Sequence, residues 1–357
     1  MNQIFMNPEN DKSHIASLPM FFIIGRPRSG TTMLASLFDA HPNIMLPFEC
    51  PLIINIYSKY HKISYWDKST LLGLYQNLIR QRKFDSWRID PEDFKSYILS
   101  LEGKASFETI IKAVYLKFNS FFEKHDIRII GDKNPVYAIY PETLFRLFPN
   151  AQFIYLLRDY RDNILSIQKV DFEAPFTALL AFRWRFAAKR IEKLKKKCPR
   201  QIYTIRYEDL VQYPELHLRR MCDFLGIHYD ATVLDFYRIK DELLEKFPRG
   251  HIERYHSSLL NPVDATRVFG WKKTMPLHDV ITADTVVGKY ASLSGYTSQR
   301  WAKNIPVLFK AATGFAYGYC AYQLRFAVDH FPFRLKSYIR NKGPLMAVLY
   351  NRWILKK

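Results

Sequence analysis

Short apolar runs recur along much of the chain, and the segments between them have helical periodicity. The runs that we predict as β-strands are Phe21–Ile24, Ile44–Leu46, Arg128–Gly131, Gln152–Leu157 and Gln201–Ile205. Apolar strands that alternate with helices favour a parallel sheet, because each helix returns the chain to the edge where the next strand starts. The pattern therefore predicts an α/β fold in which helices flank a parallel β-sheet.

Apolar residues repeat at helical spacing over the segments that connect these strands. We predict helices over Ser69–Arg82, Pro91–Leu101, Phe107–Lys124, Pro141–Phe148, Pro175–Cys198 and Pro214–Leu225. Residues 51–127 are mostly helical in this interpretation, and we expect them to cover the acceptor side of a site. We divide the chain into an N-terminal extension (residues 1–20), a main domain (21–300) and a C-terminal tail (301–357).

The first predicted strand leads into a loop with the layout of a phosphate-binding loop. This loop consists of Gly25, Arg26, Pro27, Arg28, Ser29, Gly30, Thr31 and Thr32, and a helical apolar pattern follows it. The N–H groups of such a loop and of the helix N-terminus present positive partial charge to an anion. The spacing matches the P-loop of nucleotide-hydrolysing enzymes, except that Thr31 stands where that loop has its lysine.

The missing lysine argues against ATP hydrolysis, since the P-loop lysine normally holds the β- and γ-phosphates. Mg²⁺ would also need a carboxylate after a second strand, for which Asp132 and Asp159 are the candidates. Each of them is adjacent to a cation, Lys133 or Arg158, and this disfavours a divalent ion. We therefore predict an anion site without a metal, and a P-loop kinase or NTPase is the alternative.

Several cations and one tyrosine come directly after predicted strands. Arg26 and Arg28 follow the first strand, Lys133 and Arg158 follow later strands, and Tyr207 follows the last. Ligands of parallel α/β sheets collect at the carboxyl ends of the strands. We expect these side chains to meet at one edge of the sheet, around an anion.

The composition adds to the case for an anionic partner. Of 357 residues, 53 are basic and 34 are acidic, which gives a formal net charge of +19. Nucleic acid, an acidic membrane surface or a polyanionic cofactor would each balance this charge, and a solvated basic surface is the alternative. The apolar content of 48% is enough for a large core.

The cysteines and the N-terminus bear on the cellular compartment. Cys50, Cys198, Cys222 and Cys320 are far apart, without the spacing of a zinc site or a disulfide framework. Residues 1–20 lack a continuous apolar core and contain charges, so we do not expect a secretory signal there. These features predict a reducing, cytoplasmic setting.

Several motifs, in order, resemble those of the PAPS-dependent sulfotransferases (PAPS is 3′-phosphoadenosine 5′-phosphosulfate). They are PRSGTT followed by DAHPN, an acidic residue at Glu49, DKNP, FIYLLRDYRDNILS and NPVDATRVFGW. The resemblance extends from Phe21 to Lys273 and is nearest to the tyrosylprotein and bacterial types. It implies the sulfotransferase fold, PAPS as the donor, no metal, and transfer of the sulfonate group to an acceptor hydroxyl.

The resemblance also implies roles for the residues at the strand ends. Arg28 and the backbone of residues 29–32 would hold the 5′-phosphate and the sulfonate, and Arg26 and Pro27 belong to the same loop. Lys133 would lie beside the bridging oxygen and assist its departure. The alternative for Lys133 is a surface ion pair with Asp132.

Further roles concern the 3′-phosphate and the adenine. Arg158 and Ser166 resemble the pair that holds the 3′-phosphate, and the alternative is a surface ion pair of Arg158 with Asp159 or Asp162. Tyr207 resembles the tyrosine on the adenine side, and core packing is its alternative. Ser257 or Ser258, Arg267 and Lys272 are predicted contacts in a closing loop, where Gly270 replaces a lysine of the tyrosylprotein enzymes.

Glu49 is the base that we predict for the acceptor hydroxyl. It follows a predicted strand and lies among Leu46, Pro47, Phe48 and Cys50. Such apolar surroundings are expected to raise the pKa of a carboxyl group toward neutrality. A histidine base, His125 or His256, is the alternative.

The tail over residues 301–357 is not covered by the resemblance. It contains ten Lys and Arg residues against one Asp, or +9, together with twelve aromatic residues. Only fourteen uncharged residues separate Lys310 from Arg325, too few for a spanning helix. We predict contact with an anionic membrane surface, or else a helical cap or an oligomer face. No recognition motif supports nucleic-acid binding.

The acceptor is predicted from composition alone. An aromatic content of 16% and the apolar, basic tail favour a lipid-like or sterol-like alcohol. A saccharide and a peptide tyrosine are the alternatives, because fold and donor site do not determine the acceptor. The predicted location is the cytoplasm, at the inner face of a membrane, and a homo-oligomer is compatible with the sequence.

Overall fold

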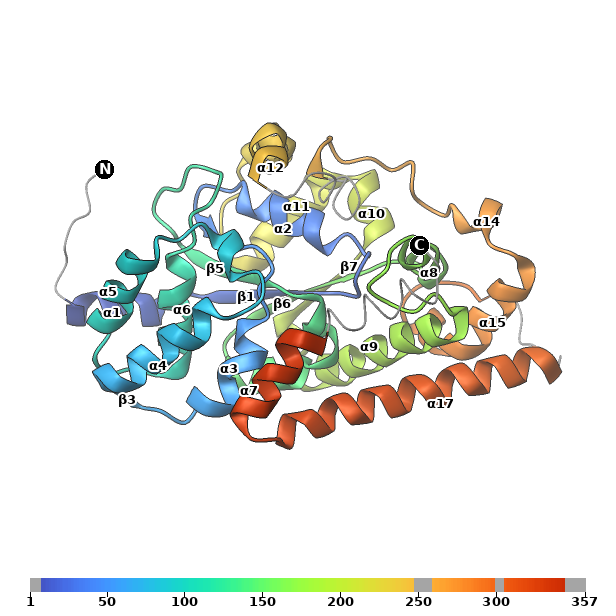
Figure 1. Cartoon of the computed structure of the whole chain (residues 1–357). Helices are drawn as coiled ribbons and strands as arrows, with labels where there is room; N and C mark the ends of the chain where they lie inside the picture. The colour runs from blue at the N-terminus through green and yellow to red at the C-terminus, as the bar shows by residue number, and fades with distance from the viewer. Residues whose placement is uncertain (1–7, 247–258, 299–304, 344–357) are drawn as a thin grey trace.

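The computed structural model describes residues 8–246, 259–298 and 305–343. At its centre is a parallel five-stranded sheet with the order β2-β5-β1-β6-β7 (Figure 1). The strands are β1 (Met20–Ile24), β2 (Ile44–Met45), β5 (Ile129–Lys133), β6 (Gln152–Leu157) and β7 (Ile202–Arg206). The short strands β3 (Tyr65–Trp66) and β4 (Gly103–Lys104) form a separate antiparallel pair. The predicted α/β fold with a parallel sheet is confirmed.

Helices connect the strands and cover both faces of the sheet. The first half of the chain contains α1 (Pro8–Ser17), α2 (Thr31–Asp39), α3 (Leu52–Tyr60), α4 (Lys68–Ile79), α5 (Pro91–Ser100), α6 (Phe107–Leu116), α7 (Pro141–Leu147) and α8 (Tyr160–Gln168). The second half contains α9 (Thr177–Lys197), α10 (Tyr207–Gln212), α11 (Pro214–Leu225), α12 (Lys240–Lys246), α14 (Trp271–Thr274), α15 (Leu277–Val287), α16 (Tyr290–Leu293) and α17 (Ile305–Ala327). Short 3₁₀ helices are η1 (Phe84–Trp87), η2 (Pro135–Ile139), η3 (Pro199–Gln201), η4 (Ala231–Ile239) and η6 (Val328–His330).

The central strand β1 aligns the loop after it with the end of β5. Ile23 of β1 is opposite Lys133 of β5 in the parallel register. The sequence predicted that this neighbouring strand would stop at Gly131, but it continues through Asp132 to Lys133. Lys133 therefore has the fixed backbone of a paired strand residue, next to the point where the phosphate-binding loop begins.

Both faces of the sheet are buried, as expected for parallel strands. On one face, the Phe22 ring packs against Tyr137, Phe148 and Phe153, with centroids 5.2 to 5.7 Å away. On the other face, Phe21 belongs to a second core with residues of α2, α10 and α11. In Figure 1, α2, α10 and α11 lie above the sheet, and α3, α7, α9 and α17 lie below it.

One predicted helix is much shorter in the structure, for a tertiary reason. The pattern predicted a helix over Phe107–Lys124, but α6 ends at Leu116. Beyond that end, Asn119 donates its N–H to the carbonyl of Trp87 at 3.1 Å. This bond to a distant segment takes the chain out of the helical path, and it could not be read from local periodicity.

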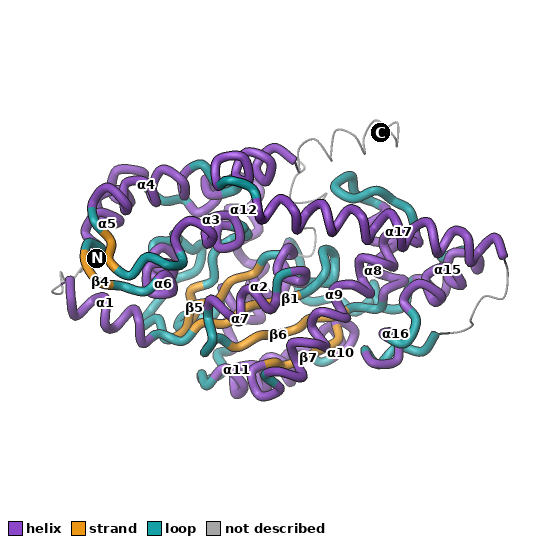
Figure 2. Tube along the Cα trace, turned by 90° about the horizontal axis from the view of Figure 1, so that it is seen from below, coloured by secondary structure: helices purple, strands orange, loops and turns teal. Residues whose placement is uncertain are grey.

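The helix α17 of the C-terminal tail packs with one side along α9 and α15 (Figure 2). A Cβ atom on Gly314 would lie 2.3 Å from the Ala178 Cβ, so glycine is needed for this close approach. The Tyr322 ring lies 4.6 Å from Phe186 of α9. Within the described residues, no helix is long and apolar enough to span a membrane. The proposed division of the chain at residues 20 and 300 stays a prediction.

Candidate active site

The loop after β1 is shaped by left-handed backbone conformations. Arg28 has a φ of 66° and Gly30 a φ of 91°. A Cβ atom on Gly30 would lie 2.5 Å from the Tyr207 ring, so this ring closes over the loop where only glycine fits. Gly30 also precedes α2 as an N-cap without a side-chain acceptor. The N-terminus of α2 is therefore available to bind an anion in the loop.

Side chains from α8 hold this loop. Arg28 Nε donates to Ser166 Oγ at 3.2 Å, and Asn163 Nδ2 donates to Pro27 O at 2.7 Å and to Ser29 Oγ at 3.2 Å. Asn163 and Ser166 have i,i+3 spacing, so they share one face of α8. Sequence reasoning identified Ser166 but missed Asn163, although this spacing within the RDNILS segment was a usable signal.

Arg158, at the end of β6, joins the loop to a distant segment. Its Nη1 donates to Arg28 O at 3.1 Å and its Nη2 to Arg267 O at 2.9 Å. Its guanidinium carbon lies 4.5 Å from the centroid of the Tyr207 ring. The alternative of a surface pair with Asp159 or Asp162 is wrong, because Arg158 is buried. Asp159 pairs with Arg161 at 2.8 Å, and Asp162 accepts a hydrogen bond from the Trp271 N–H at 2.8 Å.

Two further guanidinium groups act on Arg28 at this place. Burial, followed by the like charges of Arg158 and Arg267, lowers the pKa of Arg28. Arg158 Nε is buried without a hydrogen-bond partner among the described residues. An anion with several oxygens would relieve both the repulsion and the missing hydrogen bond.

Arg26 contacts other partners than Arg28, the second cation of the loop. Its Nη2 lies 2.9 Å from Glu173 Oε2, and Arg183 of α9 contacts the same oxygen at 2.7 Å. Burial tends to raise the pKa of Glu173, but the two guanidinium groups outweigh burial and lower it to about 2. Removing one partner of such a buried ion pair typically costs about 3–5 kcal/mol. The Arg26 guanidinium thus anchors the loop to α9, and only its backbone is left for the predicted cofactor contact.

A second group of charged residues lies where β5 meets the start of α2. Lys133 Nζ contacts Glu49 Oε2 at 2.9 Å and Thr32 Oγ1 at 3.1 Å. Lys83 Nζ contacts the other oxygen of Glu49, Oε1, at 2.9 Å. One ammonium group therefore touches both the phosphate-binding loop and the carboxylate that we predict as the base.

Lys83 is the second residue that sequence reasoning missed. The pattern predicted a helix as far as Arg82, but α4 ends at Ile79, and Lys83 lies in a turn with a φ of 73°. Gln81 in this turn accepts a hydrogen bond from Asn55 of α3 at 2.8 Å. This left-handed backbone turns Lys83 back toward the site, and no local sequence pattern indicated it.

The charge state of Glu49 differs from the one predicted. Burial raises the pKa of its carboxyl group, but the ammonium groups of Lys133 and Lys83 outweigh burial and hold the pKa well below the ordinary value. The expectation of a pKa near neutrality is therefore wrong for this arrangement. The apolar neighbours of Glu49 were predicted correctly, but the contacts of Lys133 and Lys83 with its carboxylate were not predicted.

Asp132 is withdrawn from the site, in a buried polar cluster. It accepts hydrogen bonds from Tyr115 Oη at 2.6 Å, from Tyr137 Oη and from Asn134 Nδ2 at 3.0 Å. Burial raises the pKa of Asp132 to about 6, despite these bonds. Lys133 contacts Glu49, so the alternative of a surface pair with Asp132 is wrong. Among the described residues, no group of three His, Cys, Asp or Glu side chains is placed to hold a metal ion.

The remaining predicted residues are only partly placed. Lys272 is exposed on α14, with its ammonium group 5.0 Å from the Phe269 ring centroid. His125 is exposed and lies 3.3 Å from Glu123. Ser257, Ser258 and His256 lie outside the described residues.

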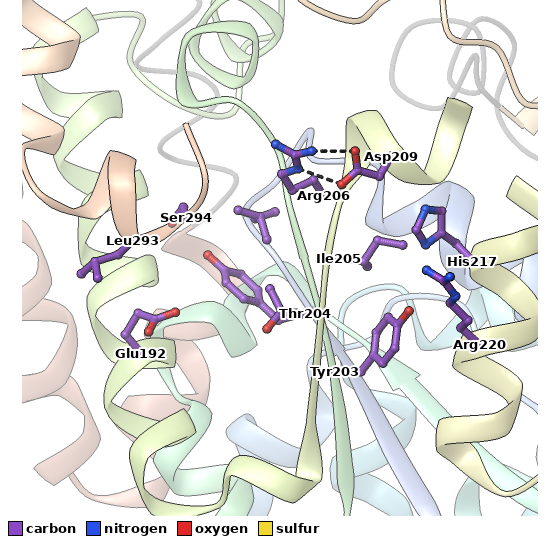
Figure 3. Close-up of a pocket in the computed structure, with 12 residues that line it drawn as sticks. Glu192, Tyr203, Thr204, Ile205, Arg206, Asp209, His217, Arg220, Leu293 and Ser294 are labelled. Carbon is purple, nitrogen blue, oxygen red and sulfur yellow. Dashed lines mark hydrogen bonds and ion pairs between the residues drawn. The ribbon is translucent and has the colours of Figure 1, made fainter. Parts of the chain in front are cut away.

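A separate hollow of about 340 Å³ opens beside the edge strand β7 (Figure 3). It contains none of the predicted site residues. Arg206 and Asp209 at its rim pair with each other at 2.8 Å, and Glu192 and Ser294 lie on the opposite side of the strand in the close-up. We assign no chemistry to it, because Arg206 and Asp209 pair with each other and Glu192 pairs with Lys195 at 3.3 Å.

Replacing Lys83 by methionine is expected to raise the pKa of Glu49, because one of two ammonium groups is lost. The folded-state pKa of Glu49 lies below its ordinary value of 4.5, so its ionised form stabilises the fold above that pH and the stabilisation declines in acid. Lys83→Met should therefore weaken this acid dependence. An NMR titration of ¹³C-labelled glutamate carboxyl groups measures the shift.

Lys95→Met is the matched control for this titration, because Lys95 forms an exposed pair with Glu92 and is not one of the two cations that lower the pKa of Glu49. It should leave the pKa of Glu49 unchanged. If Lys83→Met also leaves it unchanged, the contact between Lys83 and Glu49 does not form in solution.

Comparisons with known proteins agree with this geometry. The Sulfotransferase family profile matches residues 19–231. Protein-tyrosine sulfotransferase A of Caenorhabditis elegans is 26% identical, over 78% of this chain and 67% of the relative. Protein-tyrosine sulfotransferase 2 of Gallus gallus is 27% identical, over 76% of this chain and 71% of the relative. Among solved structures, the sulfotransferase domain from the curacin biosynthetic pathway aligns with a TM-score of 0.50 and 20% identity, over 79% of this chain and 99% of that chain.

The structural likeness bears on the fold alone, and the family match covers both the phosphate-binding loop and the Arg158–Ser166 segment. The expected sulfotransferase fold is thereby confirmed. This chain belongs to the sulfotransferase family.

Proposed function

We propose that this protein transfers the sulfonate group of PAPS to the hydroxyl group of an acceptor, with Glu49 as the base. The observation that carries the proposal is the double contact of Lys133, to Thr32 Oγ1 at 3.1 Å and to Glu49 Oε2 at 2.9 Å. A donor group held in the loop and a hydroxyl at Glu49 would both lie within reach of this one side chain. Donor and acceptor would then be held close together, which an in-line transfer requires.

The residues around the loop suit the two phosphate ends of PAPS. Arg28 and the N-terminus of α2 are suited to the 5′-phosphate and the sulfonate. Arg158 and Ser166 are suited to the 3′-phosphate, since both already contact Arg28 and Arg158 has a buried unpaired Nε. Tyr207, whose ring lies over Arg158 and Gly30, is suited to the adenine side. PAPS, when bound, supplies the activated sulfonate, and no metal is part of the proposal.

Side chains of the chain itself would stabilise the charges that change during the transfer. Lys133 and Arg28 stabilise negative charge that develops at the loop, and the loss of one such group typically costs about 10²–10³ in rate. An anion in the loop would compete with Glu49 for the Lys133 ammonium. Losing that contact would raise the pKa of Glu49 and make it a better acceptor for a proton. Lys83 would remain to hold Glu49 in place.

A tyrosine phenol is the acceptor that we now favour. The two curated relatives described above are named for protein tyrosine. With the donor bound, Lys83 would still lower the pKa of Glu49. Such a weak base accepts a proton more readily from a phenol, with a pKa of about 10, than from an aliphatic alcohol. Lys83, about one third exposed beside Glu49, would also favour an acceptor with nearby negative charge.

The hydrophobic alcohol predicted from composition is the second candidate. One observation favours it: the tail helix α17 exposes large apolar side chains, including Phe309 and Leu324 at 70% each. A saccharide acceptor has no comparable support from the described residues. The cytoplasmic location and a homo-oligomer stay predictions.

Offering radiolabelled PAPS to separate peptide, lipid and glycan fractions tests the proposal. We expect label in the peptide fraction, at tyrosine, with a rate that EDTA does not change. Label in the lipid fraction would favour the second candidate. Hydrolysis of ATP that stops in EDTA, without sulfonate transfer, would replace the proposal by a P-loop kinase or NTPase.

Two substitutions separate the base from the donor site. Glu49→Gln is expected to lower turnover by about 10²–10⁴ while binding of 3′-phosphoadenosine 5′-phosphate, the desulfonated donor, persists. Arg158→Ala should weaken that binding about tenfold to a hundredfold, because hydrogen bonds to a charged group are lost. Calorimetry and initial rates measure both. Near-normal turnover in Glu49→Gln would remove Glu49 as the base, and unchanged binding in Arg158→Ala would remove Arg158 from the donor site.

A further inference from the structure

The outward side of α17 is unusual for a surface helix. Of the exposed side chains on this 23-residue helix, only Lys310 and Arg325 carry a charge, and both charges are positive. The exposed fractions of Ile305, Phe309 and Leu324 are 78%, 70% and 70%. A helix at the surface of a globular protein normally turns charged residues outward. The apolar outward side therefore indicates a partner.

The inward side of α17 packs against the rest of the protein. Gly314, Gly318 and Tyr322 follow one another at helical spacing and pack on Ala178, Phe182 and Phe186 of α9. This packing fixes which side of the helix faces outward. Figure 1 shows α17 along the edge of the molecule below α9, with no other labelled element on its far side.

The segment after α17 has the same character. Phe331, Leu335 and Tyr338 are exposed by 42%, 47% and 65%, and the cations Arg334 and Lys342 are exposed beside them. The one carboxylate of the tail, Asp329, is neutralised by Arg340. The described tail thus presents apolar and aromatic side chains with cations, and its carboxylate is internally paired.

We propose that the outward side of α17, with the segment to residue 343, binds the surface of an anionic lipid bilayer. Aromatic and aliphatic side chains would enter the boundary between headgroups and acyl chains, and the cations would contact anionic headgroups. A second copy of the chain fits less well, because it would bring the exposed cations Lys310, Arg325, Arg334 and Lys342 against the same cations of the other copy. This inference concerns location, and it does not depend on the acceptor or on the chemistry proposed above.

Flotation of the full chain with lipid vesicles tests this proposal. Binding is expected to vesicles of phosphatidylcholine with phosphatidylglycerol, to be weaker with phosphatidylcholine alone, and to fall as salt is added. Phe309→Asp and Leu324→Asp should each reduce the partition coefficient about tenfold or more, because a charge replaces an apolar side chain that would enter the bilayer. Lys310→Gln should reduce it about fivefold on anionic vesicles and leave it nearly unchanged on neutral ones.

Leu216→Asp is the matched control, since Leu216 is 46% exposed on α11, on the other side of the sheet. It should bind vesicles like the unaltered chain. Circular dichroism of all variants verifies that they are folded, and this readout, like flotation, does not require sulfonate transfer to work.

Two results would overturn the proposal. In the first, the unaltered chain does not bind anionic vesicles, and light scattering shows a dimer that Phe309→Asp dissociates. This result would make the outward side of α17 an interface between copies. The other is vesicle binding that Phe309→Asp, Leu324→Asp and Lys310→Gln leave as strong as in Leu216→Asp, which would place the membrane contact elsewhere.

Discussion

The ion pair between Lys133 and Glu49 is the contact on which the rest of the site depends. It forms because β5 runs parallel to β1 and extends to Lys133, so that this ammonium group arrives beside the loop that follows β1. Glu49 comes from the other side, after β2, which pairs with β5. The sheet order thus determines that a cation lies between an anion-binding loop and a carboxylate.

The same edge of the sheet concentrates positive charge that needs an anion. Burial, together with the like charges of Arg158 and Arg267, lowers the pKa of Arg28. Asn163 and Ser166 of α8 hold the loop in the conformation that this cluster requires. Carboxylates elsewhere are occupied: Glu173 holds Arg26, and Asp159 holds Arg161. The arrangement favours a ligand with phosphate or sulfonate oxygens over a divalent cation.

Much of this could be predicted from the sequence, because it depends on local patterns. The five strands of the central sheet and the loop from Gly25 to Thr32 follow from periodicity, and the place of Arg158 follows from its position after a strand. The approach of Ser166 to that loop was implied by the family resemblance alone. The sequence did not predict what depends on tertiary contacts. Lys83 reaches Glu49 only because a left-handed turn is held by Asn55 and Gln81. The early end of α6 likewise depends on a bond between Asn119 and Trp87.

The most direct test of the central claim is a double-mutant cycle of Lys133→Met and Glu49→Gln, with kcat/KM for sulfonate transfer as the measured quantity. If the two side chains act as one unit between the loop and the acceptor, the double variant should lose much less than the product of the two single losses. Single losses that multiply in the double variant would show that the two residues act independently, and would contradict this account.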